Sequence, residues 1–194
     1  MTSGYYNNKN SITNGPAAGY GLYVGTIRSN GSSTIDFILG GAAAGGTAAF
    51  LMVWNQYNQV NIAPAVYDST ASWTYATGAW RPSDNSTSNR ITFVLGQAAF
   101  VEASFTNIIE NAAGYSGFIG IGINSTTVQS GVGAWGGSSV VVDGTPSLSI
   151  GASFAIGLNY IQALENTSGH TCTFYGLYSP ASDQVHGLSA SLSM

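Results

Sequence analysis

Few side chains in this sequence could transfer a proton at neutral pH or act as a nucleophile. His170 and His186 are the two histidines, and Cys172 is the single cysteine, which excludes an internal disulfide and a cysteine metal cluster. A catalytic thiol needs a histidine in contact with it. Strand alternation places positions 170 and 172 on one face, so a Cys–His dyad is conceivable. The plainer hypothesis is a half-buried cysteine beside a polar strand end.

Three glutamates, Glu102, Glu110 and Glu165, lie among apolar residues. Two carboxylates on neighbouring strands could support glycosidase-like chemistry. The sequence does not place any two of them together, and solvent-facing strand positions explain them better. No carboxylate spacing resembles a calcium loop. We therefore assign no catalytic or metal-binding residue and expect the chain not to be an enzyme.

Two glycine-rich runs have the spacing of nucleotide-binding loops without their context. Gly131–Gly136 matches G-x-G-x-x-G, but a dinucleotide site needs a helix next, and residues 137–142 read as a turn and a strand. Gly40–Thr47 has the spacing of a phosphate loop, but Gly46 occupies the place of the lysine. We interpret the first run as a glycine-rich β loop. The second run is not a phosphate-binding loop. We expect no cofactor.

Aromatic residues gather between positions 54 and 80, amid asparagines and aspartates. Flat rings with amide and carboxylate neighbours can bind a sugar, since they offer an apolar face and polar groups. The same residue types also build sandwich cores and protein interfaces. Core or interface is the favoured interpretation, and glycan contact stays open. The candidate contact residues are Trp54, Tyr57, Trp73, Tyr75 and Trp80.

Charge is scarce throughout the chain. Only 12 of 194 residues are charged, about 6%, whereas ordinary soluble domains use about a quarter. With four basic residues and a net charge of −4, the chain lacks the clustered positive charge that binding to nucleic acid requires. Edge strands normally use charge, above all lysine, to avoid association. Either the surface is neutral and polar, or other subunits cover much of it. Both alternatives indicate an assembled particle.

From Tyr20 onward the pattern predicts about eleven short strands separated by turn residues. Residues 99–109 fit a strand or a helix, and their β-branched and aromatic side chains favour the strand. We predict an all-β fold, an antiparallel β-sandwich or jelly roll, as one domain over residues 20–194. The predicted strands cover residues 20–28, 49–54, 60–67, 90–95, 99–109, 117–123, 139–142, 147–153, 154–164, 171–177 and 185–192.

Two segments need separate interpretations. Residues 1–19 are polar and rich in Asn, Ser and Gly, so we expect an extended N-terminal arm, either reaching a neighbour or disordered. Residues 37–54 run for 18 positions without a charge, the length of a membrane span. Their middle, Gly40–Gly46, is weakly hydrophobic and no basic cluster flanks the run. We predict two strands joined by a small-residue loop, and no membrane span.

Several blocks resemble a family of tailed-phage virion proteins, in which a "YxGTIR" strand is followed by "WNxYNRV". Here Tyr23–Ser29 reads YVGTIRS and Val53–Val60 reads VWNQYNQV. Gln59 stands where the family often has Arg. Fibre proteins of this kind usually carry long shaft segments before the domain, whereas about 19 residues precede it here. Further similar blocks cover residues 67–75, 80–81, 120–127, 160–165 and 173–176.

The resemblance implies a structural β-sandwich that assembles with its copies, with a trimer favoured. It implies a phage virion protein, most simply a surface-exposed capsid decoration or head-fibre subunit that binds the major capsid protein. The arm would contact a neighbouring capsomer through Tyr5, Tyr6 and Ile12. The location would be the virion surface, after synthesis in the bacterial host cytoplasm. The alternative is a tail-fibre tip or receptor-binding domain that recognises host-surface glycan through the aromatic residues.

Overall fold

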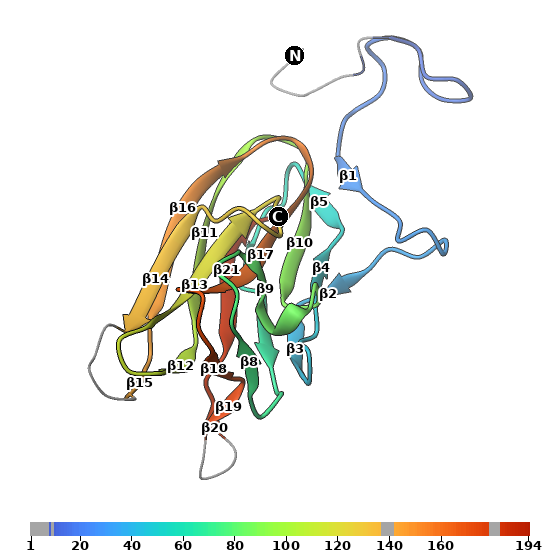
Figure 1. Ribbon diagram of the computed structural model, residues 1–194. Coiled ribbons are helices and arrows are strands. Elements are labelled where there is room, and N and C mark those ends of the chain that lie inside the picture. Colours follow the sequence, from blue (N-terminus) through green and yellow to red (C-terminus); the bar gives the residue numbers. More distant parts are fainter. Residues whose placement is uncertain (1–7, 9, 137–141, 179–182) are drawn as a thin grey trace.

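The computed structural model describes residues 8, 10–136, 142–178 and 183–194. Described residues from position 22 onward form short strands and one 3-10 turn, η1 (Ser83–Asn85), and the strands pack as layers around one core (Figure 1). The predicted all-β sandwich is therefore confirmed. Residues 99–109 are strand, as their β-branched and aromatic side chains predicted.

The first sheet is antiparallel except at one pair of strands. Neighbours in the order of its main path hydrogen-bond to one another, and β10 and β4 run parallel. A seventh strand, β9 (Arg81–Pro82), joins this sheet beside β17. The main path is β14 (Gly131–Gly136), β13 (Ser116–Ile123), β17 (Gly157–Thr167), β10 (Arg90–Leu95), β4 (Ala49–Leu51) and β2 (Phe37–Ile38).

The second sheet contains the C-terminal strand in its middle. Its main path is β16 (Ser147–Phe154), β11 (Ala99–Thr106), β21 (Gly187–Ser193), β7 (Ala65–Asp68) and β3 (Gly40–Ala43), and β6 (Asn61–Ile62) pairs with β21. Beyond Asn107 the chain of β11 continues as β12 and enters a third sheet. That sheet has the order β15 (Val142–Gly144), β12 (Ile108–Asn111), β18 (Cys172–Tyr175) and β8 (Trp73–Tyr75).

Two further strand pairs lie at opposite ends of the molecule (Figure 1). β1 (Gly25–Ile27) pairs with β5 (Val53–Asn55), which follows β4 after one residue. β19 (Leu177–Tyr178) pairs with β20 (Asp183–Gln184). The N-terminal segment before β1 extends away from the layers.

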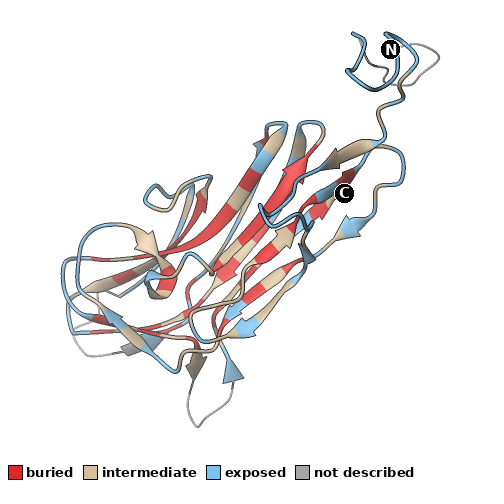
Figure 2. Cartoon of the chain, turned by 90° about the vertical axis from the view of Figure 1, so that its right-hand side faces the viewer, coloured by how far each residue is buried: buried red, intermediate tan, exposed pale blue. Residues whose placement is uncertain are grey.

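Side-chain alternation along the strands builds the core. On β11, Val101, Ala103 and Phe105 are buried whereas Phe100 and Glu102 are exposed, the period of two expected of a sheet with one covered face. Buried and exposed positions alternate in the same way along neighbouring strands (Figure 2). Burial of these apolar side chains is the main stabilising contribution.

The strand predictions differ from the structure where glycine or short length weakens the pattern. The strand predicted over residues 20–28 is only Gly25–Ile27. The strand predicted over residues 154–164 begins only at Gly157, where the φ of 112° marks a turn in the chain. Phe154 belongs to the preceding strand, β16, as its last residue. The prediction for 139–142 lies almost entirely outside the described residues. Residues 37–54, predicted as two strands joined by a small-residue loop, contain β2, β4 and most of β5, and β3 lies in the expected loop. The other strands that were not predicted are β8, β9, β14 and β20.

Candidate interaction surfaces and a buried polar network

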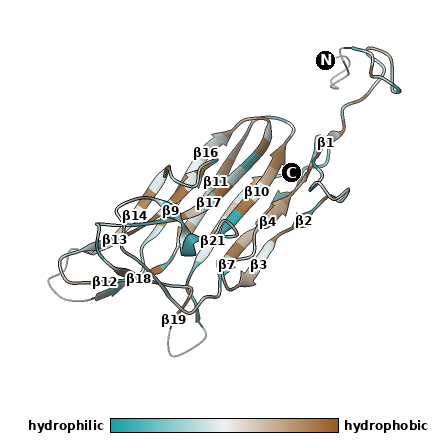
Figure 3. Cartoon of the chain, turned by 45° about the vertical axis from the view of Figure 1, so that its right-hand side comes forward, coloured by the Kyte–Doolittle hydropathy of each residue, from teal (hydrophilic) through white to brown (hydrophobic). Residues whose placement is uncertain are grey.

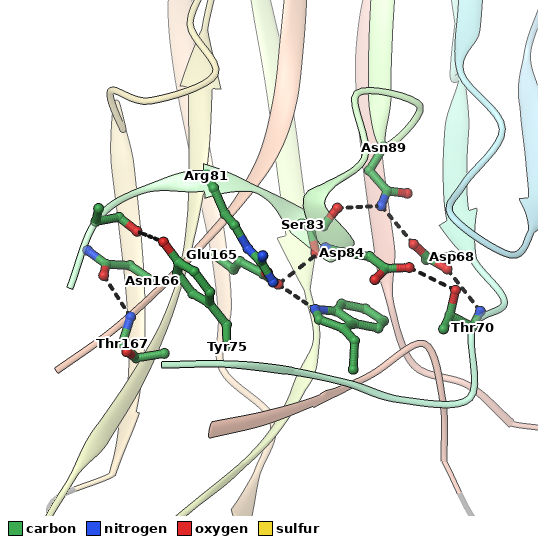
Figure 4. A network of polar contacts seen from close by, with 12 residues as sticks. Asp68, Thr70, Tyr75, Arg81, Ser83, Asp84, Asn89, Glu165, Asn166 and Thr167 are labelled. Carbon is green, nitrogen blue, oxygen red and sulfur yellow. Dashed lines mark hydrogen bonds and ion pairs between the residues drawn. The ribbon is translucent and has the colours of Figure 1, made fainter. Parts of the chain in front are cut away.

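Glu165, on β17, is the centre of a buried polar network (Figure 4). Its side chain is 0% exposed. Arg81 donates to Oε1 from Nε and from a terminal nitrogen, each at 2.7 Å. Trp73 Nε1 donates to Oε2 at 2.6 Å, and the Asp84 backbone N–H donates to the same oxygen at 3.3 Å. Both carboxylate oxygens are therefore occupied by protein donors.

Local structure explains why these donors converge. Arg81 lies directly opposite Glu165 in the β9–β17 register. The chain then turns through η1, where Asp84 adopts a φ of 53°, a left-handed conformation that aspartate tolerates better than most residues. The Arg81 guanidinium carbon also lies 3.8 Å from the centre of the Tyr75 ring, a cation–π contact. These contacts with Glu165 hold the segment from β8 to η1 against β17.

Burial raises the pKa of Glu165 to about 7, against the lowering effect of its hydrogen bonds from Trp73 and Arg81. A perturbed carboxyl can indicate a catalytic acid. Such an acid must reach its substrate, and this one is enclosed and fully hydrogen-bonded. The arrangement is that of a structural ion pair.

A second buried carboxylate, Asp68, extends the network. Its Oδ1 accepts from the backbone N–H groups of Gly45 and Thr70, both at 2.9 Å. Its Oδ2 accepts from Asn89 Nδ2 at 2.8 Å, and its own backbone N–H donates to His186 Nδ1 at 3.2 Å. Burial lowers the pKa of His186 to about 4. Asp68 thus joins three loops to the C-terminal strand region.

The three glutamates form no carboxylate pair, and the favoured interpretation of solvent-facing strand positions holds for Glu102 but is wrong for Glu165, which is buried. Glu102 is exposed on the outer face of β11. Glu110, on β12 of the third sheet, accepts a hydrogen bond from the Tyr175 hydroxyl at 2.8 Å. Glu165 is enclosed in the interior. The three glutamates therefore belong to three different surroundings.

The cysteine and histidine considered for a dyad also differ in exposure. Cys172 is 0% exposed and packs in the core, and burial raises the pKa of its thiol. His170 is exposed, with its ring 3.5 Å, centre to centre, from that of Tyr115. A raised pKa suppresses the thiolate that a nucleophile requires. The plainer hypothesis of a cysteine without a catalytic role fits this arrangement, but Cys172 is fully buried and not half-buried as expected.

The five aromatic candidates do not form one surface. Trp54 is 1% exposed and stacks on Tyr23 in the core, so it is withdrawn from the candidate contact residues. Trp73 stacks on Phe174, and Tyr75 lies under Arg81. Trp80 is half-buried against β13. Tyr57, in the turn after β5, is 45% exposed.

The predicted arm has a described part that is organised around Asn8. The Asn8 side chain donates to the carbonyl oxygens of Asn10 and Ala17, each at 2.8 Å, and accepts from the Gly21 N–H at 2.6 Å. These bonds close a loop that stands off the layers (Figure 1). Ile12, one predicted contact, is 53% exposed on this loop. The other two, Tyr5 and Tyr6, lie outside the described residues.

Sequence reasoning missed a serine-rich face on the second sheet, here called the serine face. Its outward residues line a shallow depression of about 550 Å³ in which Glu102 is the one charged residue. Alternate serines in residues 147–153 and 187–193 were the signal that could have revealed it. The serine face consists of Ser104, Thr106, Ser147, Ser149, Gly151, Ser153, Gly187, Ser189, Ser191 and Ser193.

Within the described part of the chain, no group of three or more His, Cys, Asp or Glu side chains could hold a metal ion. No helix formed by the described residues is both long and apolar enough to span a membrane.

Comparisons with known proteins give little further information. No protein-family model and no curated protein matches the chain. One similar solved structure is that of Eiger TNF from S. frugiperda, at 6% identity and a TM-score of 0.44. The match covers 68% of this chain and 91% of that one. A likeness this distant carries no argument about function or assembly.

Proposed function

We propose that this chain is a structural subunit of a tailed-phage virion, exposed on the capsid as a decoration protein or head-fibre subunit. It acts by binding and self-assembly. The supporting sequence evidence is the set of blocks that resemble phage virion proteins, together with a charge content of about 6%. The observation that carries the proposal is the N-terminal loop, which projects from the sandwich and presents apolar side chains to solvent.

This loop is ordered by its own hydrogen bonds but does not bury its apolar side chains. Tyr20 is 87% exposed, and Ile12 and Leu22 are 53% and 52% exposed. The Tyr23–Trp54 stack holds the end of the loop on the body. A projecting, tethered loop with uncovered apolar residues is suited to docking against another protein. We assign it to the contact with the major capsid protein.

The copies of the chain are proposed to form a homo-oligomer on the virion surface, and the resemblance favours a trimer. The enclosed, fully hydrogen-bonded Glu165 and the buried Cys172 support a binding role in preference to an enzymatic one. The carboxylate and the thiol are both placed where they stabilise the fold.

The experiment is removal of residues 1–19. The shortened chain should remain folded, because the described residues among those removed, 8 and 10–19, add none of the buried core side chains. It should no longer co-sediment with purified phage heads, because Ile12 and the Asn8 side chain that closes the loop are lost. The control is the full chain with Val128→Ser, a change at a 61% exposed position in the turn after β13. Undiminished attachment of the folded, shortened chain would refute the role of the loop.

A second candidate function is glycan recognition at a fibre tip, and the serine face favours it. The hydroxyls of Ser104 and Ser189 lie 2.8 Å apart across β11 and β21. Phe100, 63% exposed, lies over Gly151 beside the depression, and Glu102 lines it. Hydroxyls, an exposed ring and a carboxylate can all contact a sugar. Binding of the purified chain on a glycan array would separate this function from capsid decoration.

A further inference from the structure

The outward face of the second sheet carries two aromatic rings, each of which lies over a glycine. A Cβ added at Gly151 would lie 2.4 Å from the Phe100 ring. One added at Gly187 would lie 3.2 Å from the Tyr67 ring. Phe100 is 63% exposed and Tyr67 is 38% exposed. Because glycine has no side chain, each ring lies close to the backbone and still contacts solvent.

The strand register places both rings on the serine face. β16, β11, β21 and β7 lie side by side in this order (Figure 3). Gly151 lies opposite Glu102, and Gly187 lies opposite Thr106, four residues further along β11. The β7–β21 register, continued by one residue, places Tyr67 beside Gly187. At about 3.4 Å per residue and about 4.8 Å between strands, the two glycines are about 17 Å apart.

Hydroxyl groups line the space between the two rings. The depression of about 550 Å³ on the serine face adjoins a second one of about 390 Å³, because Ser104 and Ser189 border both. A serine hydroxyl has one donor and two acceptor sites, so this bonded pair can still bind a ligand. The two depressions together are here called the hydroxyl trough. Its hydroxyl side chains include Ser104, Thr106, Ser149, Ser189 and Ser191.

One wall of the hydroxyl trough is held rigidly from below. Gln184 borders the second depression, and its Nε2 donates to the carbonyl oxygens of Asp68 at 2.6 Å and Gly176 at 2.9 Å. Its Oε1 accepts from the Ser69 hydroxyl at 3.3 Å. A side chain that is already fixed loses little conformational entropy when a ligand binds. The wall is therefore organised before binding.

Charge is nearly absent from the hydroxyl trough. Among the described residues that border it, Glu102 is the one charged residue, since the His186 side chain is buried and neutral at pH 7. A carboxylate accepts hydrogen bonds from hydroxyl groups and repels phosphate, sulfate and other carboxylates. With no lysine or arginine among these residues, nothing there would bind a nucleic-acid backbone. Charge complementarity favours an uncharged ligand with many hydroxyls.

We propose that the hydroxyl trough binds a linear, uncharged oligosaccharide that reaches from Phe100 to Tyr67. The proposal rests on the second candidate function above and names its ligand class. The apolar face of a sugar ring packs on an aromatic ring, and its hydroxyls bond to serine hydroxyls and a carboxylate. A single sugar is too short to contact two rings about 17 Å apart. A protein partner fits less well, because interface cores are apolar and depleted in serine.

A glycan array probed with the purified full chain tests the ligand class. It carries uncharged mono-, tri- and hexasaccharides of hexoses and N-acetylhexosamines, beside uronic-acid, sialylated and phosphorylated glycans. We expect binding to an uncharged hexasaccharide, and about tenfold weaker binding to its monosaccharide, which contacts one ring only. Acidic glycans should not bind. Absence of binding to every uncharged glycan, or equal binding to acidic ones, would overturn the proposal.

Substitutions then locate the site. Phe100→Ser and Tyr67→Ser should each weaken hexasaccharide binding about tenfold, because each removes one ring. Ser191→Gln fills the hydroxyl trough at an exposed position without changing its charge, and keeps the test decisive if a variant that lacks a ring does not fold. Val128→Ser, 61% exposed after β13, is the control and should bind as wild type does. Undiminished binding in the folded variants would refute the site.

Failure of this proposal and failure of the capsid role have different readouts. Co-sedimentation with phage heads measures capsid attachment, and the array measures glycan binding. A chain that attaches to heads but binds no uncharged glycan would retain the capsid role and lose the hydroxyl trough as a site. A chain that binds the hexasaccharide but not heads would retain the site and lose the capsid role.

Discussion

Glu165 and His186 are buried, and burial opposes the ionisation of both side chains. Their titrations change the free energy of unfolding in opposite directions as pH rises. The folded-state pKa of Glu165 is raised from 4.5 to about 7, so the unfolded chain loses its proton first as pH rises. This lowers the free energy of unfolding between about pH 4.5 and 7. The pKa of His186 is lowered from 6.5 to about 4, so stability is lost as pH falls through that range.

Glu165→Gln should therefore change the pH dependence of stability. Glutamine cannot ionise, so the component that falls with rising pH disappears and the His186 component remains. Between about pH 4.5 and 6.5 the free energy of unfolding should rise more steeply with pH than in wild type, by up to about 1.4 kcal/mol per pH unit. Urea denaturation at several pH values measures this slope.

Glu102→Gln is the control for that comparison, because Glu102 is exposed on the outer face of β11. It should keep the wild-type slope. A Glu165→Gln slope equal to that of wild type would show that Glu165 does not titrate in this range. Above about pH 7, where Glu165 is ionised in the folded chain, Glu165→Gln is also expected to lose stability, since Arg81 loses its charged partner.

At the scale of elements, the turn between β10 and β11 connects the sandwich to the N-terminal segment. Gly96 in this turn lies against the Tyr23–Trp54 stack. A Cβ at position 96 would lie 2.2 Å from Trp54 Cε3 and from the Tyr23 hydroxyl, closer than atoms can approach. The contact requires glycine because the two rings fill the space above the turn.

Gly96→Ala should displace this stack and destabilise the fold by about 1–3 kcal/mol, the usual cost of overpacking. Thermal unfolding measures the change in stability, and a difference in tryptophan fluorescence between Gly96→Ala and wild type measures the displacement of Trp54, one of four tryptophans. Gly78→Ala is the matched control, because a Cβ there would meet its nearest atom at an ordinary 3.5 Å. Equal stability of the two variants would contradict the close packing at Gly96.

Strands were predictable where a continuous apolar run dominated the local sequence. β10 spans Arg90–Leu95, the predicted residues; four of its six residues, Ile91, Phe93, Val94 and Leu95, are apolar, and the strand is buried on both faces. β3 and β14 were missed because glycine contributes neither an apolar side chain nor β propensity. β3 pairs with β7, which is distant in sequence, and β14 pairs with β13 across a turn. Such partners supply the stabilisation that local pattern cannot reveal.

The candidate site was less predictable than the fold. The aromatic residues are close in sequence, but alternation and turns send Trp54 into the core and leave Tyr57 at the surface. The Arg81–Glu165 pair joins residues 84 positions apart, so no local motif marks it. The serine face has a readable alternation, yet its assembly from β16, β11 and β21 depends on strand order. Long-range pairing is the information that the sequence pattern lacks.

At the scale of the whole molecule, two surfaces have distinct proposed roles. The N-terminal loop would bind the capsid, and the serine face would remain exposed. A chain with 4 basic residues has few charges with which to resist such contacts. This division of surfaces explains a low charge content that an isolated soluble domain would rarely have.

The central claim is that the protein belongs to the outer surface of a virion. Immunogold electron microscopy of purified phage particles, with antibodies against the folded chain, tests it most directly. We predict regular labelling of the outside of the head in intact particles and its loss in particles made with the chain that lacks residues 1–19. Intact particles that carry no label, with the protein recovered only from the free fraction of the lysate, would contradict the claim.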